Sequence, residues 1–397
     1  MKERIKKILE TKKYESMSLD ELIDEYIMLL QNNSRKNLDD LLSEILILIQ
    51  RYDSKLSRAS LEEIAIAQAY SINSLPKNLL LTTLIYEKSL TNNTKLTIRF
   101  GAPDERGITA IEKKLLWING NSNERTANKL REIFQDALRG KYTRVELLDK
   151  LREEFAGYKE LEEHKLKAAA DLNLRQARNM GTVARAIGLG DKYLQIVAKI
   201  DDKTTNICRS MHLRVIKVSD IEKQYDNLIS AETIEDAKAA SDLSRSNEGL
   251  WKKELPQNFG IPPYHFGCRT IVRQMSSIQV DEMQLDEFGR EYAVNKNILE
   301  KIEFEHLSET KYNTPEELIK KTINNIEKEG VHINNPEKRV IYGRNGVLVV
   351  LDRNGKIETA YKPSAGLRGY LNTTGEIYYN EVRKSLFERV TKWILEN

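Results

Sequence analysis

The chain has 397 residues, and its 63 lysines and arginines against 60 aspartates and glutamates give a formal net charge of only +3. This balance excludes the basic excess that is typical of dedicated nucleic-acid-binding proteins and leaves only local patches for that role. Two cysteines are too few for a disulfide scaffold, and no apolar run is long enough to span a bilayer, so we expect no membrane partner.

The first hundred residues show the apolar spacing of packed helices. Ser18 and Glu21 form a predicted capping box at the start of SLDELIDEYIMLLQ, and the pattern continues in NLDDLLSEILILIQRY and SLEEIAIAQAYSI. After a loop at FGAPDERG, helices are predicted over ITAIEKKLLWI, NERTANKLREIFQDALRG and TRVELLDKLREEFAG, the last two ending at a glycine. A long helix over YKELEEHKLKAAADLNLRQARNMGTVARAIGLG follows.

The helical spacing of apolar residues ends near residue 191. From there, β-branched runs flank the Asp-rich turn DDKTT and predict a strand, a turn and a further strand or helix. A long irregular loop and an acidic stretch come next. The predicted organisation is a helical region over residues 1–99, a core over 100–279, a linker over 280–299 and a C-terminal domain over 300–397.

The last hundred residues predict a helix followed by a sheet. Thr314 and Pro315 begin a predicted helix that ends at Gly330. The dipeptides Asn345-Gly346 and Asn354-Gly355 lie between apolar runs and predict a three-stranded antiparallel meander, since both residues tolerate positive φ. A terminal amphipathic helix is predicted over EVRKSLFERVTKWILE, and the fold class is therefore α+β.

The scarce cysteines and histidines fall into two short segments. Cys208 and His212 are four residues apart in ICRSMH, and His265 and Cys268 are three apart in PPYHFGCRT. Two thiolates and two imidazoles complete a tetrahedral zinc site, although the pairing differs from that of a standard zinc finger. The alternatives are a buried apolar cysteine with a backbone-bonded histidine, a catalytic thiol, and a disulfide in an oxidising setting.

These segments resemble the signature of the phage Mu F-like family of head morphogenesis proteins, also called minor head or minor capsid proteins. The resemblance covers AKIDDKTTNICRSMH and PPYHFGCRT within roughly residues 120–275. The matching positions are Asp202, Thr205, Cys208, Arg209, His212, Pro262, Pro263, His265, Cys268 and Arg269. One position departs from the pattern, because the family commonly has glycine where this chain has Leu213, which puts a tight turn there in doubt.

The resemblance implies a minor structural protein of a phage or prophage head, located in the virion or the host cytoplasm. Its implied partners are the portal and other capsid proteins, with packaged DNA or RNA as a further partner. A zinc ion on Cys208, His212, His265 and Cys268 is implied at the level of the family. We expect Arg209 and Arg269 to hold loops together through Asp202; phosphate binding is the alternative role for the two arginines.

The C-terminal segment VIYGRNGVLVVLDRNGKIETAYKP resembles domains of the barnase–EndoU–colicin–RelE nuclease superfamily, with which some Mu F-like proteins end. Metal-independent RNA cleavage needs an acid, a base and cations for the phosphate. The candidates for these roles are His306, His332, Lys338, Arg339, Thr359 and Tyr361. A toxin-like ribonuclease carried on a head protein is therefore the first alternative function. A DNA-binding head component, through LRQARNMGTVARA and KKELPQ, is the second.

Overall fold

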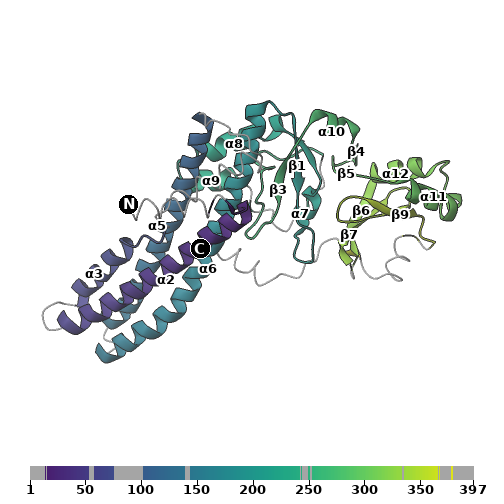
Figure 1. Ribbon diagram of the computed structural model, residues 1–397. Helices are drawn as coiled ribbons and strands as arrows, with labels where there is room; N and C mark the ends of the chain where they lie inside the picture. The colour runs from purple at the N-terminus through teal and green to yellow at the C-terminus, as the bar shows by residue number, and fades with distance from the viewer. Residues whose placement is uncertain are drawn as a thin grey trace. The chain divides into compact units, whose positions relative to one another are not determined.

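The computed structural model divides the chain into two compact units, which are described separately (Figure 1). Residues 1–181 with 229–234 form the first, and residues 182–228 with 235–397 form the second. The structure describes residues 14, 16–52, 58–75, 102–138, 144–241, 243, 249–250, 253–332, 335–364, 366 and 377–378. The predicted terminal helix over residues 381–396 lies outside this part of the chain.

The first unit is built from long helices: α2 (Leu19–Tyr52), α3 (Arg58–Tyr70), α5 (Ala102–Leu138) and most of α6 (Arg144–Leu189). A hydrophobic core joins them, with Leu41, Ala65, Phe134 and Phe155 almost completely buried. The predicted capping box at Ser18 is confirmed, because the backbone N–H of Ser18 donates to Glu21 Oε2 at 2.6 Å and that of Glu21 donates to Ser18 Oγ at 3.3 Å. In the part of the chain that the structure describes, no helix is long and apolar enough to cross a membrane.

Two predicted helix ends, the one after Ile118 and the one at Gly157, are absent, because α5 and α6 continue through them. Gly120 lies inside α5 and Gly157 inside α6, and both are exposed with nothing within 4 Å of an added Cβ. A helical glycine costs about 1 kcal/mol. The buried apolar side chains on either side, such as Phe155 and Leu166 in α6, outweigh that cost.

The second unit contains a three-stranded antiparallel sheet in the order β2-β1-β3. The strands are β1 (Tyr193–Val197), β2 (Val215–Lys217) and β3 (Ile271–Met275). The accompanying helices are α7 (Asn206–Met211), α8 (Val218–Ser230), α9 (Ile234–Ala239) and α10 (Ser277–Glu282). In the central strand, Leu194 lies opposite Ile216 and Ile196 lies opposite Val272. All four are buried, so the sheet has a closely packed apolar centre.

The same unit continues with a hairpin of β4 (Gln284–Leu285) and β5 (Glu291–Tyr292), followed by a second sheet. Two helices, α11 (Lys296–Glu305) and α12 (Pro315–Ile323), and a short 3-10 turn (Leu307–Glu309) precede that sheet. Its strands are β6 (Ile326–His332), β7 (Asn335–Gly343), β8 (Leu348–Leu351), β9 (Ile357–Tyr361) and β10 (Ile377–Tyr378), in the order β10-β6-β7-β8-β9. The antiparallel β7-β8-β9 pairing confirms the predicted meander, and the class is α+β, as predicted.

Two predicted boundaries in this unit differ from the structure. The segment expected to be a linker, 280–299, is not an irregular connection: it contains β4 and β5 and the start of α11. The helix expected to end at Gly330 ends at Ile323, and residues from Ile326 form strand β6 instead. Pairing with β7 satisfies the backbone groups of β6 and overrides the helical preference of Glu327, Lys328 and Glu329.

Candidate metal centre

The turn between β1 and α7 is held by its own side chains. Thr204 Oγ1 accepts the backbone N–H of Asp201 at 2.8 Å and donates to the carbonyl of Lys199 at 2.8 Å. Thr205 is the N-cap residue of α7, and the helix carries Cys208 and Arg209 toward the loop before β3. Asp201 and Thr204, one residue before the matched Asp202 and Thr205, thus make the contacts within the turn, while Asp202 is exposed and Thr205 Oγ1 lies 3.0 Å from His265 Nε2.

The loop before β3 presents His265 in a fixed orientation. Pro262 and Pro263 are buried and joined by a cis peptide bond. His265 Nδ1 lies 2.8 Å from the carbonyl oxygen of Phe266, to which it can only donate. The lone pair of Nε2 consequently points toward Cys208 Sγ at 3.1 Å and Thr205 Oγ1 at 3.0 Å. A backbone carbonyl that holds one ring nitrogen while the other faces thiols is the usual arrangement of a metal-binding histidine.

Three of the four predicted ligands come together. The ligand atoms of Cys208, His265 and Cys268 all lie within 4.8 Å of one another, and the group could hold a metal ion. The two sulfurs are 3.6 Å apart, and both cysteines are free and at most 3% exposed. Thr270 Oγ1 donates to Cys208 Sγ at 3.2 Å. Two sulfurs and one imidazole form a soft donor set that suits zinc, with a fourth position left for water.

The pKa values of the two thiols are shifted in opposite directions. The hydrogen bond with Cys268, together with burial, raises the pKa of Cys208 well above its ordinary value. Burial opposes ionisation of Cys268, but its hydrogen bonds with Cys208 and His265 hold the pKa of Cys268 well below its ordinary value. One thiolate is therefore stabilised within the pair, and a thiolate is the form of cysteine that binds metals.

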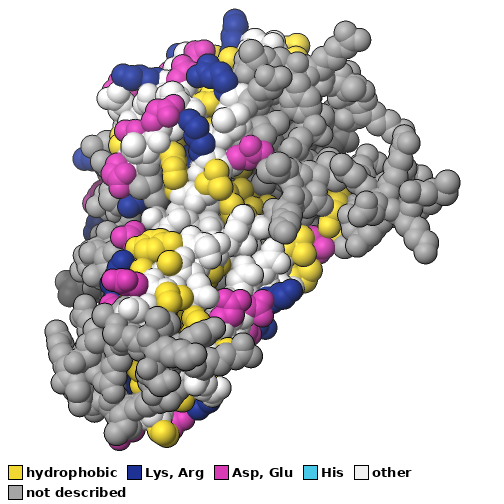
Figure 2. Space-filling model, turned by 90° about the vertical axis from the view of Figure 1, so that its left-hand side faces the viewer, with side chains coloured by type: hydrophobic (Ala, Val, Ile, Leu, Met, Phe, Trp, Pro, Cys, Tyr) yellow, Lys and Arg dark blue, Asp and Glu magenta, His cyan; other side chains and the backbone are white. Residues whose placement is uncertain are grey.

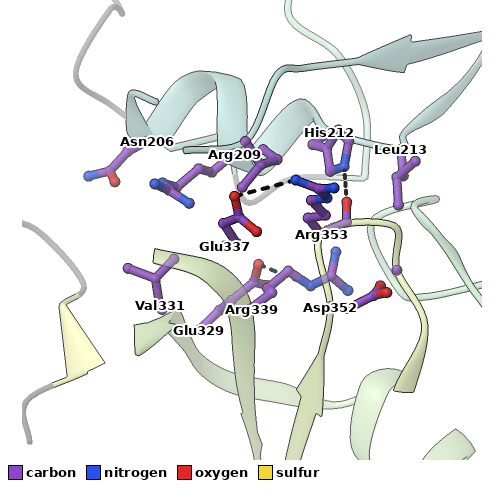
Figure 3. Close-up of a pocket in the computed structure, with 13 residues that line it drawn as sticks. Asn206, Arg209, His212, Leu213, Glu329, Val331, Glu337, Arg339, Asp352 and Arg353 are labelled. Atoms are coloured by element: carbon purple, nitrogen blue, oxygen red, sulfur yellow. Dashed lines mark hydrogen bonds and ion pairs between the residues drawn. The ribbon is translucent and has the colours of Figure 1, made fainter. Parts of the chain in front are cut away.

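His212, the fourth predicted ligand, lies outside this group. Its Nδ1 accepts the backbone N–H of Ala198 at 3.1 Å, and its Nε2 donates to the carbonyl of Arg353 at 2.7 Å (Figure 3). Burial and the nearby arginines lower the pKa of His212 to about 4, which keeps the imidazole neutral. The next residue, Leu213, has φ of +62°, so the tight turn that its side chain put in doubt is formed.

Both motif arginines hold backbone and loops together. Arg269 binds Asp201 bidentately, with Nη1 to Oδ2 and Nη2 to Oδ1 both at 2.7 Å. Arg209 donates to three carbonyl oxygens, those of Asp201, Thr204 and Pro336. The expected pinning role is thus visible for both, but through Asp201 and not Asp202.

The bond between Arg269 and Asp201 makes stability depend on pH. Chiefly through this bond, the pKa of Asp201 falls from 3.8 to about 2. Because the folded-state pKa is the lower one, stability is fully present above pH 4 and is lost as pH falls toward 2. We expect Asp201→Asn to cost about 1–2 kcal/mol at pH 7 and to flatten this acid decline, measured by urea unfolding from pH 7 to pH 2. The exposed neighbour supplies the control, since Asp202→Asn should change stability by less than about 0.5 kcal/mol; equal effects of the two changes would contradict the assignment.

A small pocket lies between α7 and the β6-β7-β8 sheet (Figure 3). Its volume of about 50 Å³ is enough for a few water molecules. Its charged lining residues are Arg209, Arg339 and Arg353 with Glu329, Glu337 and Asp352. Three cations face three anions, and Arg353 is paired with Glu337 at 3.4 Å.

A buried ionic cluster, formed by Asp286, Arg290, Glu329 and Arg339, lies next to this pocket. Arg290 donates to both oxygens of Glu329 at 2.8 and 2.7 Å and to Asp286 Oδ2 at 2.8 Å. Arg339 Nη2 lies 3.3 Å from Asp286 Oδ2. Burial alone would lower the pKa of Arg290, but Glu329 and Asp286 raise that pKa above its ordinary value. The cluster fixes the β4–β5 hairpin to β6 and β7.

The ribonuclease candidates are only partly brought together. His306 is the C-cap of α11, and its ring lies 5.5 Å from that of Tyr361, on the same strand as Thr359. Lys338 pairs with Glu358 at 2.7 Å, and Arg339 belongs to the buried ionic cluster. His332 lies at the end of β6, and its side chain is outside the described part of the chain. Both candidate cations are thus neutralised by carboxylates.

In the basic patch of α6, Arg175 and Arg178 are paired with carboxylates, whereas the buried Nε and Nη1 atoms of Arg185 have no hydrogen-bond partner among the residues that the structure describes. Arg178 pairs with Asp20 at 2.7 Å, and Arg175 pairs with Asp171 at 2.8 Å. On the face shown in Figure 2, acidic and basic side chains are interspersed. Of the second patch, Lys252 lies outside the described residues.

Comparisons with known proteins gave no family model, no curated protein and no solved structure that matches the chain.

Proposed function

We propose that the chain is a structural protein of a phage or prophage head, acting in head morphogenesis near the portal. In this proposal a zinc ion on Cys208, His265 and Cys268 stabilises its second unit. The observation that supports it most is the convergence of two segments 60 residues apart on one buried group of three ligands. Three other polar residues of the motif connect the same two segments. Arg209 and Arg269 bond to the turn between β1 and α7, and Thr205 bonds to His265 in the loop before β3.

The proposed zinc is a structural ion. Although its fourth position is left for water, a buried site with two sulfurs and one imidazole would add the free energy of metal binding to that of folding, because the metal would join α7 to the loop before β3. Cys208 and Cys268 would bind as thiolates, and His265 would bind through Nε2, because Nδ1 is held by Phe266. Thr270 would orient the sulfur of Cys208 through its hydroxyl hydrogen bond.

Elemental analysis of protein purified without chelator tests the zinc site. We expect close to one zinc per chain in the wild type and less than about a tenth of that in His265→Asn, because two thiolates alone hold zinc weakly. The matched control is His212→Asn, which makes the same substitution at the histidine that lies outside the group. This variant should retain close to one zinc per chain.

The zinc content of the wild type and of the two variants shows whether the site binds metal and which histidine is a ligand. Wild-type protein without zinc would overturn the metal proposal, and zinc loss in both variants would restore His212 as a ligand. The role in the head needs a separate test, namely mass spectrometry of particles released when a prophage that encodes this chain is induced. Its absence from DNA-filled particles, beside detectable portal protein, would overturn the structural role.

A further inference from the structure

The two thiols of the candidate metal centre lie directly against each other. Cys208 Sγ and Cys268 Sγ are 3.6 Å apart, whereas a disulfide needs about 2.05 Å, so a small movement separates contact from a bond. We infer that in the metal-free protein Cys208 and Cys268 form an intramolecular disulfide when a small peroxide reaches them. The inference rests on the proposed function only in that zinc would occupy and shield the same thiols.

Polar groups surround the sulfur pair. His265 Nε2 lies 3.1 Å from Cys208 Sγ, and Thr270 Oγ1 donates a hydrogen bond to the same sulfur. These contacts hold Cys208 Sγ in place beside Cys268 Sγ, 3.6 Å away. A second sulfur held in contact is what converts the first oxidation product of a thiol into a disulfide.

Burial selects the oxidant. Cys208 is 3% exposed and Cys268 is 1% exposed, so bulky disulfide reagents have no access to either sulfur. Hydrogen peroxide is close to water in size and can reach them through small fluctuations of the loop that carries Cys268. Because the second sulfur is already in contact, the first oxidation product is captured before it can be oxidised further.

The reaction balances with hydrogen peroxide as the two-electron oxidant. One thiolate attacks a peroxide oxygen, so that an S–O bond forms, the O–O bond breaks, and the released hydroxide takes a proton to become water. The second thiolate then attacks the sulfenic sulfur, so that the S–S bond forms and the S–O bond breaks. The hydroxide released in this step is also protonated to water. Two thiols are thereby oxidised and one peroxide is reduced to two waters.

The disulfide would replace the zinc ion as the link between α7 and the loop before β3. In the zinc form the ion would connect α7 to the loop before β3, and in the oxidised form a covalent bond connects the same two segments. Zinc cannot bind the oxidised form, since both thiolates are consumed. The two states are therefore mutually exclusive, and oxidation is expected to release the metal.

The test treats chelator-stripped full-length chain with a small excess of hydrogen peroxide, then unfolds it, alkylates free thiols and measures mass. We expect the mass to fall by two hydrogens, both cysteines to escape alkylation, and a peptide containing Cys208 to be linked to one containing Cys268. Cys208→Ser should instead gain oxygen at Cys268 without a cross-link. Zinc loading should slow wild-type oxidation by about tenfold or more.

Other outcomes overturn the inference. Alkylation of both cysteines in peroxide-treated wild type, stable oxygen adducts, or disulfide-linked dimers would each exclude the intramolecular bond. These readings need only the wild-type chain, so poor folding of the variant does not weaken them. A chain that binds zinc but forms no disulfide would sink this inference alone, whereas a disulfide in a chain that binds no zinc would sink only the metal proposal.

Discussion

Arg290→Met is expected to lower the free energy of unfolding of the second unit by about 3–5 kcal/mol, because it removes the fully buried cation of an ionic cluster. The variant leaves Asp286, which is 0% exposed at its side chain, and Glu329, at 5%, with Arg339 as the remaining cation. One buried negative charge is then uncompensated. Methionine matches much of the volume of arginine, so the cost is mainly electrostatic.

The measurement is urea unfolding, with hydrogen exchange of β5, β6 and β7 amides to confirm which part of the chain opens. Lys338→Met is the matched control, since it removes a partly exposed cation from its pair with Glu358 on the same sheet and should cost less than about 1 kcal/mol. Glu329→Gln added to Arg290→Met should recover part of the loss, because it restores charge balance. An Arg290→Met variant that unfolds at the same urea concentration as the control would contradict the assigned role.

Local signals in the sequence predicted the C-terminal meander well. The turns at Asn345-Gly346 and Asn354-Gly355 require positive φ at glycine, and the structure has φ of +77° at Gly346 and +78° at Gly355. Strand β6 was missed because its charged run Glu327, Lys328 and Glu329 lacks the alternation of apolar and polar residues, and its pairing with β7 decides its conformation.

Of the four metal ligands predicted from spacing, Cys208, His265 and Cys268 come together and His212 does not. Helical spacing would place His212 beside Cys208, but α7 ends at Met211 and the chain turns through Leu213, which directs the imidazole toward Ala198 and Arg353. Nothing local to ICRSMH indicates this early end. Asp201 was overlooked in favour of Asp202 because two adjacent aspartates and two adjacent threonines allow two registers of one pattern.

The buried ionic cluster was not visible in the sequence. Asp286 and Arg290 lie in an acidic segment whose composition predicts a solvated linker. Their partner Glu329 is 39 residues beyond Arg290, in a segment whose sequence predicts an exposed helix. Charged residues are rarely buried unless paired, so each one alone predicts exposure. Only the three-dimensional pairing reverses that expectation.

Gly355→Ala is expected to destabilise the second unit by about 3 kcal/mol or more, whereas Gly346→Ala should cost only about 1–2 kcal/mol. The two glycines have nearly the same positive φ, which penalises an L side chain to a similar extent at both positions. They differ in their surroundings: an added Cβ at Gly355 would lie 2.7 Å from Leu213 Cδ1 and 2.8 Å from the carbonyl oxygen of Glu291, but at Gly346 the nearest atom is 3.8 Å away.

Urea unfolding of both variants, with and without Leu213→Ala, separates the two contributions. Leu213→Ala should recover part of the Gly355→Ala loss by removing the contact with Cδ1, and it should recover nothing in Gly346→Ala. Part of the loss should persist, because the carbonyl oxygen of Glu291 is a backbone atom. It cannot move away easily, since the backbone N–H groups of Glu291 and Ala293 on either side donate hydrogen bonds to Leu213 and Gly355. Equal costs for the two glycine substitutions would show that Leu213 does not pack against the β8–β9 turn.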